Sequence, residues 1–357
     1  MYNSLHGFRI GINYGRVANN LPTPSRVASF ILSLNITRVR IYDADPEVLL
    51  AFANKYVELT IGLENKYIVN FTDPAHAQKW VEQHVAPYAN HTNIKMITIG
   101  NEVLTGDDTK MKNSLVPAMV NVQKALDNLG LSQKIYVNTA HSYGIMNVSF
   151  PPSSGKFKSE LVGYLEEILD FLSQHNSPFL MNVNPYFAYR DDPKHVSLAY
   201  VLFEPNPGQT DPVTKLHYDN MLYAQTDAVY FAIDALSAYM DSAIKATPGF
   251  TVYNTETGWP SRGGLRRGRP PLGAKIKNAR LYNGNLLKRV EAKQGTPLKP
   301  SIPIDASIFA LFDEDLKPGP DTERHYGLFY PNMTPVYDIG LQGPRGGRAA
   351  ASIQRVD

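Results

Sequence analysis

The chain has 357 residues, of which 43% are hydrophobic and 19% are charged, so it carries enough apolar residues for a large folded domain. Its 35 basic and 33 acidic residues leave a formal net charge of +2, which argues against a nucleic-acid partner because such proteins concentrate positive charge. Cysteine is absent, which excludes disulfide scaffolds, thiolate zinc sites and cysteine nucleophiles.

Short apolar runs alternate along the chain with longer amphipathic stretches. The apolar runs predict eight strands, over residues 8–15, 37–45, 57–64, 94–102, 134–140, 178–187, 250–256 and 302–312. The amphipathic stretches predict helices over residues 24–34, 46–56, 75–85, 115–130, 159–175, 219–240 and 277–293. Eight such units predict a single α/β domain, a (β/α)8 TIM barrel over residues 8–342, followed by a flexible polar tail over residues 343–357.

An open, doubly wound parallel sheet is the alternative architecture for this pattern. The turn after the first predicted strand, GINYGRVANNLPTP at residues 11–24, is not a Gly-x-Gly-x-x-Gly loop. The chain also lacks a Gly-x-x-x-x-Gly-Lys-Ser/Thr loop and a His-Glu-x-x-His metal motif. We therefore expect the barrel, with no nucleotide, metal or other cofactor.

Two glutamates stand at the ends of apolar strands. Glu102 ends the fourth predicted strand and Glu256 ends the seventh, so both side chains are expected to face the barrel mouth, where the active sites of such barrels lie. Two facing carboxylates are typical of glycoside hydrolases. Aromatic residues also lie at or just after strand ends, either to stack on sugars or to pack the barrel: Tyr14, Tyr42, Tyr186, Phe187, Tyr189, Trp259 and Phe312.

Longer motifs carry a family resemblance. They include GINYGR at residues 11–16, RIYDADP at 40–46, IGNEVLTGDD at 99–108, ETGWPSRG at 256–263 and FALFDEDLKPGP at 309–320. With them, the chain resembles the plant endo-1,3-β-glucanases of glycoside hydrolase family 17, over residues 11–341. The resemblance implies a retaining hydrolase with Glu102 as general acid/base and Glu256 as nucleophile. These roles require a raised pKa at Glu102 and an ionised Glu256.

The resemblance also implies a set of residues that bind substrate. Asn101 resembles the residue that hydrogen-bonds the sugar 2-hydroxyl in related barrel glycosidases. Glu314 and Lys317 match a glutamate and a lysine that the family carries beyond its last strand. Together with the aromatic residues, the expected substrate-binding set is Tyr14, Tyr42, Asn101, Tyr186, Phe187, Trp259, Phe312, Glu314 and Lys317.

Four positions depart from the family pattern. Asn184 and Ser307 stand where tyrosines are usual, Asp313 where an asparagine is usual, and Thr255 where a serine is usual. Two missing rings beside the cleft and an extra carboxylate near the glutamate pair favour a weakened or inactive barrel that only binds cell-wall β-glucan. The intact glutamate pair favours endo-hydrolysis of 1,3-β-glucans such as callose.

The remaining expectations concern location and partners. Sequons occur at Asn35, Asn70, Asn90, Asn147 and Asn332, compared with roughly three expected by chance. The sequence contains neither a signal-peptide pattern nor a membrane span. From the resemblance we expect a monomeric glycoprotein of the cell wall or apoplast, with a role in plant defence, whose signal was removed or whose longer precursor is anchored to the plasma membrane. A basic loop predicts a solvated face or contact with an anionic wall polymer such as pectin; it carries Arg262, Arg266, Arg267, Arg269, Lys275 and Lys277.

Overall fold

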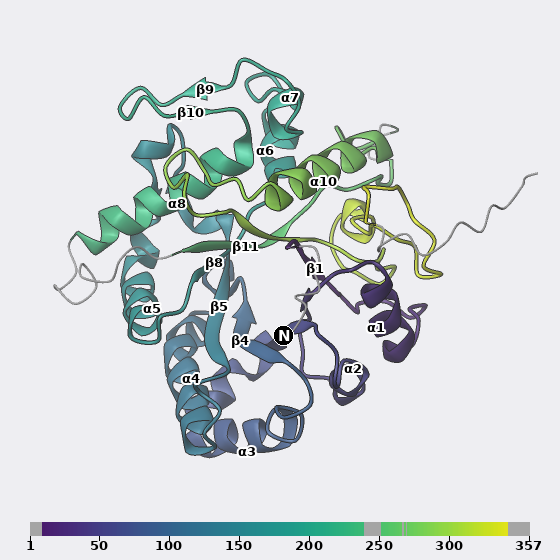
Figure 1. The fold of residues 1–357 in the computed structure, drawn as a ribbon. Helices are drawn as coiled ribbons and strands as arrows, with labels where there is room; N and C mark the ends of the chain where they lie inside the picture. The colour runs from purple at the N-terminus through teal and green to yellow at the C-terminus, as the bar shows by residue number, and fades with distance from the viewer. Residues whose placement is uncertain (1–8, 239–250, 266–267, 269, 342–357) are drawn as a thin grey trace, which may run out of the picture.

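Eight strands close into a parallel barrel within the residues that the computed structural model describes, which are 9–238, 251–265, 268 and 270–341. Around the barrel the strands follow the order β1, β2, β3, β4, β5, β8, β11, β12, and β12 pairs with β1. They are β1 (Gly11–Asn13), β2 (Arg38–Arg40), β3 (Glu58–Leu63), β4 (Ile94–Asn101), β5 (Tyr136–Ser142), β8 (Phe179–Asn182), β11 (Val252–Thr257) and β12 (Asp305–Ile308). The predicted (β/α)8 barrel is confirmed (Figure 1). The predicted tail over residues 343–357 lies outside the described residues.

Helices connect the strands and cover the outside of the barrel (Figure 1). They include α1 (Pro24–Ser33), α2 (Pro46–Ala51), α3 (Pro74–His84), α4 (Thr109–Asn128), α5 (Val162–Gln174), α8 (Met221–Ser237) and α10 (Ile276–Glu291). Proline opens α1, α2 and α3, as expected for a residue with a fixed φ and no N–H. The Asp108 side chain accepts a hydrogen bond from the Met111 N–H, so α4 begins at Thr109 and not at the predicted residue 115.

The sixth predicted strand, residues 178–187, is wrong at its end. β8 stops at Asn182, and Pro185 opens helix α6 (Pro185–Asp191), because proline suits the first turn of a helix and cannot donate to a strand ladder. The structure also contains elements that the periodicity did not predict: helix α7 (Leu198–Val201), the hairpins β6 (Met146–Val148) with β7 (Lys156–Phe157) and β9 (Gln209–Thr210) with β10 (His217–Tyr218), and the 3₁₀ helices η1 (Asn65–Thr72), η2 (Val103–Thr105), η3 (Tyr143–Ile145), η4 (Pro152–Ser154), η5 (Ser159–Leu161) and η6 (Asp321–Arg324).

The buried core has a part outside the strands and a part inside the barrel. Outside, the helices bury apolar stripes; Ile31 of α1 is fully buried, which contributes about 1.5–3 kcal/mol. Inside, Met96, Ala140 and Leu180 form a separate apolar layer. Because side chains alternate along a strand, Asn182 shares the inner face with Leu180 but lies nearer the carboxyl end of β8. The apolar layer is therefore the floor beneath a polar barrel mouth.

The segment after β12 packs against α1 and brings charged groups over the mouth. Phe30 of α1 lies between Phe312 and Phe329, with ring centroids 6.3 and 4.8 Å away. This packing fixes the start of the turn that follows. Glu314 in that turn accepts a hydrogen bond of 2.9 Å from the backbone N–H of Val17, in the loop after β1. Two segments that are far apart in the sequence thus form one wall of the mouth.

Candidate active site

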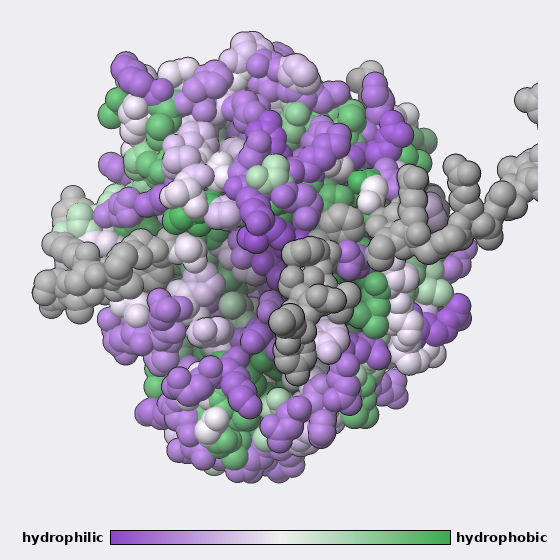
Figure 2. Space-filling view, in the orientation of Figure 1, coloured by the Kyte–Doolittle hydropathy of each residue, from purple (hydrophilic) through white to green (hydrophobic). Residues whose placement is uncertain are grey.

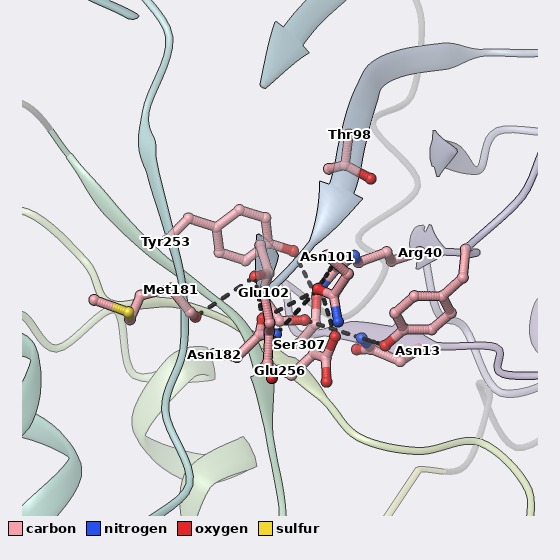
Figure 3. Close-up of polar contacts among 12 residues, drawn as sticks. Asn13, Arg40, Thr98, Asn101, Glu102, Met181, Asn182, Tyr253, Glu256 and Ser307 are labelled. Atoms are coloured by element: carbon pink, nitrogen blue, oxygen red, sulfur yellow. Dashed lines mark hydrogen bonds and ion pairs between the residues drawn. The ribbon is translucent and has the colours of Figure 1, made fainter. Parts of the chain in front are cut away.

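The structure brings Glu102 and Glu256 into one hydrogen-bonded network at the carboxyl ends of the strands (Figure 3). The Asn182 amide donates to Glu102 Oε1 at 2.9 Å, and Arg40 Nη1 donates to Glu256 Oε1 at 2.9 Å. Arg40 Nη1 also donates to Asn182 Oδ1 at 3.3 Å, which links the two halves of the network. The two carboxylates predicted from the strand ends therefore lie together.

The backbone at Glu102 is irregular and is held by a side chain from the neighbouring connection. Gly100 and Glu102 have φ values of +67° and +58°, in the left-handed region that is uncommon for residues other than glycine. Asn65, at the start of η1, accepts from the Asn101 N–H at 2.7 Å and donates to the Asn101 carbonyl at 3.0 Å. The regular pairing of β3 and β4 ends at Leu63 with Ile99, so the Asn65 amide supplies the next pair of the ladder. A side chain at position 100 would crowd this amide, because an added Cβ would lie 2.9 Å from Asn65 Oδ1.

Arg40 is hydrogen-bonded to three residues of the network. Its side chain is 3% exposed, and besides Glu256 and Asn182 it binds Asn101, with Nη2 2.8 Å from Asn101 Oδ1. The planar guanidinium can serve several oxygens in fixed directions, which an ammonium group cannot. The guanidinium carbon, Cζ of Arg40, also lies 4.8 Å from the ring centroid of Tyr42. Sequence reasoning missed Arg40 and Asn182 because both lie inside the predicted strands 37–45 and 178–187, whereas β2 and β8 end at these residues.

Tyr42 and Asn13 complete the surroundings of Glu256. Asn13 Nδ2 donates to the Tyr42 hydroxyl at 2.8 Å and to the Thr255 carbonyl at 3.0 Å. Burial and the neighbouring Glu256 charge raise the pKa of Tyr42, so its phenol stays neutral. The Thr255 hydroxyl lies 2.8 Å from Asn182 Oδ1 and donates to it. Threonine thus provides the hydroxyl that serine would bring to this position.

The environment of Glu102 raises the pKa of its carboxyl group. Burial is the largest cause of its raised pKa, and the charge of Glu256 is the second. The hydrogen bond from Asn182 and the charges of Arg40 and Lys317 act in the opposite direction but do not cancel the increase. A carboxyl group that serves as a general acid needs such a raised pKa.

Glu314 and Lys317 lie on the wall formed after β12. Glu314 is buried, which raises its pKa, while Lys317 and the Val17 N–H oppose the increase. Lys317 Nζ lies 3.9 Å from Glu314 Oε2 and 3.7 Å from the ring centroid of Phe309. A side chain at position 15 would force the Glu314 carboxylate to move, because an added Cβ would lie 2.4 Å from its oxygens.

The cleft around the glutamates has two arms. The first arm, a cavity of about 750 Å³, runs over the loops after β1 and β2. The second arm, of about 770 Å³, runs from Glu102 past η3 to α6. The two arms share Asn101, Glu256, Phe309 and Lys317 in their linings. An extended chain can therefore pass over the glutamate pair with both ends free.

The aromatic residues divide into two groups. Tyr42 and Tyr14 line the first arm, although Tyr14 is only 2% exposed, and Phe187 lines the second. Trp259, Tyr186 and Phe312 line neither arm and are at most 2% exposed, so the expectation that they stack on sugars is wrong.

The Trp259 side chain does not face the mouth, because the Gly-Trp-Pro turn directs it into the core. Its Nε1 donates to the Gly273 carbonyl at 2.8 Å, and its ring packs against Tyr186 and Tyr282. Phe312 packs instead against Tyr14 and Phe30. These rings support the cleft residues from behind.

Two of the positions that differ from the family pattern, Ser307 and Asn184, lie in different parts of the barrel. Ser307 is inside the barrel, where its hydroxyl lies 2.5 Å from that of Tyr253, so the expectation of a missing ring beside the cleft is wrong there. Tyr253 from the neighbouring strand occupies the interior instead. Asn184 does line the second arm, and its amide donates to the Tyr326 hydroxyl at 3.3 Å.

The expectation that the Asp313 carboxylate faces the glutamate pair is wrong, because its partners lie elsewhere. Its Oδ1 accepts from the Gly327 N–H at 3.0 Å, while its Oδ2 lies 3.3 Å from His325 Nδ1 and 3.9 Å from Arg262 Nη2. Its charge helps to raise the pKa of Glu314. The extra carboxylate is thus held by the C-terminal segment. Of the basic loop, Arg262, Lys275 and Lys277 are exposed, and Arg266, Arg267 and Arg269 lie outside the described residues.

Among the residues that the structure describes, no group of three or more His, Asp or Glu side chains is arranged to hold a metal ion.

Comparisons with known proteins identify relatives over nearly the whole chain. Residues 10–341 match the sequence model of the glycosyl hydrolases family 17. The chain is 52% identical to glucan endo-1,3-beta-glucosidase 14 of Arabidopsis thaliana over 340 residues, which is 95% of this chain and 83% of that protein. It resembles the solved structure of CJP38, a beta-1,3-glucanase and allergen of Cryptomeria japonica pollen, with 40% identity and a TM-score of 0.86 over 93% of this chain and 99% of the other. It also resembles one of two plant beta-glucan endohydrolases, with 34% identity and a TM-score of 0.81 over 92% of this chain and 99% of the other. The chain therefore belongs to the glycosyl hydrolases family 17.

Proposed function

We propose that the protein is a retaining endo-hydrolase of 1,3-β-glucans, such as callose, in which Glu102 is the general acid/base and Glu256 the nucleophile. The observation that carries the proposal is the linked pair: one carboxyl with a raised pKa and a second that is ion-paired with a buried arginine. The names of the relatives, glucan endo-1,3-beta-glucosidase and beta-1,3-glucanase, support the substrate class.

The reaction takes two steps. Glu102 gives its proton to the glycosidic oxygen while a carboxylate oxygen of Glu256 attacks the anomeric carbon, so the leaving chain departs with that proton and a glycosyl ester forms on Glu256. Glu102, now ionised, then takes a proton from water as this water attacks the anomeric carbon and releases Glu256. Each step inverts the anomeric carbon, so the product retains the β configuration.

The neighbouring groups fit these steps. Asn101 Oδ1 accepts from Arg40 and Asn182, which leaves Asn101 Nδ2 as a donor for the 2-hydroxyl of the sugar at the cleavage point. Asn182 holds the Glu102 carboxyl in place for proton transfer. A cleft with two arms suits attack within a chain, because both sides of the bond find room.

We also propose that the protein acts outside the cell, on wall glucan. The sequon residues Asn70, Asn90, Asn147 and Asn332 are exposed, as acceptors of N-linked sugars must be. In the described part of the chain, no helix is both long enough and apolar enough to cross a bilayer. Mass spectrometry of the protein from its natural source tests the proposal through sugars attached at these positions.

Incubation with a linear 1,3-β-glucan tests the activity itself. We expect new reducing ends together with a rapid loss of viscosity, since internal cuts shorten the polymer early. A linear 1,4-β-glucan serves as the comparison and should be cut more slowly. A folded protein that binds the 1,3-β-glucan but releases no reducing ends would establish the alternative, a glucan-binding barrel without activity.

In Lys317→Met, the alkaline limb of the profile of kcat/KM against pH is expected to move to higher pH. Glu102 must be protonated in the first step, so kcat/KM falls as pH rises through its pKa, and Lys317 lowers that pKa. Removing the cation therefore raises the pKa and preserves activity at higher pH. The matched control is Lys110→Met, at an exposed lysine of α4, which should leave the profile in place. A limb that stays or moves down in Lys317→Met would argue against Glu102 as the acid.

Asn65→Ala is expected to lower kcat by roughly 10- to 100-fold with little change in KM, because losing both bonds to the Asn101 backbone displaces Glu102 from its working position. Steady-state kinetics on a soluble 1,3-β-glucan measure the effect. Asn128→Ala removes an exposed side-chain hydrogen bond to Gln78 on the helical surface and should change neither constant. Equal kinetics of the two variants would refute a positioning role for Asn65.

A further inference from the structure

A third cavity adjoins the first arm of the cleft. This side cavity, of about 420 Å³, is bounded by the loop after β2, the end of β3, η1 and α3. Asp43 and Glu64 line both the side cavity and the first arm. A chain that occupies the first arm can therefore continue into the side cavity without leaving the protein surface.

One wall of the side cavity is aromatic. Trp80 is stacked on His84, with ring centroids 5.6 Å apart and planes 17° apart, and it meets Phe71 edge-on at 5.8 Å. Tyr67 is 41% exposed, and Lys66 Nζ lies 4.8 Å from its ring centroid. These contacts fix the Trp80 ring in the wall, while Tyr67 presents a ring to solvent. Flat rings of this kind offer an apolar surface to the C–H face of a sugar.

The lining of the side cavity also carries carboxylates whose charge is partly neutralised. Arg16 Nη2 binds Asp43 at 2.6 Å and Asp45 at 2.8 Å, and Glu64 is paired with Lys66 at 2.8 Å. The remaining lone pairs of these carboxylates can accept hydrogen bonds from hydroxyl groups. The carboxylates would repel an anionic ligand, and a purely apolar one would leave them without partners. A neutral polyhydroxyl ligand with an apolar face fits both the aromatic and the carboxylate part of this lining.

The face of the molecule that Figure 2 draws is mostly polar. Hydrophilic residues dominate the coloured surface in this view, and hydrophobic residues appear as small separate patches (Figure 2). Protein interfaces usually present a larger contiguous apolar area. The side cavity itself, of about 420 Å³, has room for a small unit such as one sugar ring and not for a folded partner.

We propose that the side cavity is a distal subsite that binds a glucosyl unit of the same 1,3-β-glucan chain that is cleaved at Glu102 and Glu256. This assignment rests on the proposed function for the identity of the sugar. A subsite far from the cleaved bond binds the ground state and the transition state alike, so it favours long substrates through KM. The side cavity thereby makes the enzyme selective for long chains.

Tyr67→Ala tests the subsite through the ratio of kcat/KM for a long linear 1,3-β-gluco-oligosaccharide to that for a short one. We expect this ratio to fall by about tenfold, the order of magnitude of one lost ring contact. Tyr136→Ala is the matched control, because Tyr136 is 42% exposed and lies at the start of β5, at the opposite end of the barrel. The control should keep the wild-type ratio. A Tyr67→Ala ratio equal to that of wild type would overturn the subsite.

A binding measurement separates failure of the subsite from failure of the proposed function. In a Glu256→Gln background, calorimetry should show that Tyr67→Ala lowers the affinity for the long oligosaccharide by about tenfold relative to the affinity for the short one. If the wild type cuts no glucan but this difference in binding persists, the hydrolytic function is wrong and the subsite stands. If the wild type cuts glucan and binding does not depend on Tyr67, the subsite is wrong and the hydrolytic function stands.

Discussion

Replacing Glu256 with glutamine is expected to lower kcat on a linear 1,3-β-glucan by roughly 10³-fold or more, because an amide oxygen cannot form the glycosyl ester. Glu102→Gln should produce a loss of similar order, since the amide has no proton to give the leaving oxygen. Both changes keep the shape of the side chain, so glucan binding should persist. Steady-state kinetics and binding calorimetry on the same preparations measure the two effects.

Glu58→Gln is the control for these substitutions. Glu58 is an exposed glutamate that begins β3, at the amino end of the barrel and far from the mouth, so its loss should leave kcat within about twofold. If Glu102→Gln or Glu256→Gln kept activity within about tenfold of the wild type, the assigned roles would be wrong.

Arg40→Met is expected to lower kcat by roughly 100-fold and to move the alkaline limb of the pH profile upward. The guanidinium binds Glu256, Asn101 and Asn182 at once, so its removal loosens all three. Its charge also lowers the pKa of Glu102, so the pKa rises when the charge is lost. Removing one partner of a buried ion pair also destabilises the fold, by about 3–5 kcal/mol at fully buried sites and less here because Glu256 is 17% exposed.

Arg38→Met separates the catalytic from the structural part of that effect. Arg38 lies on the same strand, where it binds Asp305 and the Tyr253 hydroxyl near the amino end of the barrel. Its removal should lower stability in chemical denaturation while leaving the pH profile in place. An equal shift of the alkaline limb in both variants, or unchanged kinetics in Arg40→Met, would show that Arg40 has no special part in the site.

The barrel and the glutamate pair could be predicted because both follow from local patterns. Apolar strands alternate with amphipathic helices over the whole chain, and this pattern survives errors at single boundaries. Glu102 and Glu256 are charged residues at strand ends, where burial of an unpaired carboxylate would be costly. Arg40 and Asn182 end β2 and β8 in the structure, but both lie inside longer predicted strands, so the same criterion did not single them out.

Other features of the site depend on contacts that no local pattern encodes. Asn65 acts through its amide on the backbone of a strand that is distant in sequence. Ser307 lacks a ring, and the structure fills that space with Tyr253 from the adjacent strand. Trp259 follows a strand end but is turned into the core, which its position alone could not show. In each case the three-dimensional neighbour decides the role of the residue.

Proton NMR of the first product, recorded during cleavage of a 1,3-β-gluco-oligosaccharide, tests the two-step mechanism on the glutamate pair most directly. With Glu256 as nucleophile and Glu102 as acid and base, the new reducing end is released as the β-anomer, and the α-anomer appears only later through mutarotation. Release of the α-anomer first would contradict a glycosyl ester on Glu256, because a single displacement by water inverts the anomeric carbon.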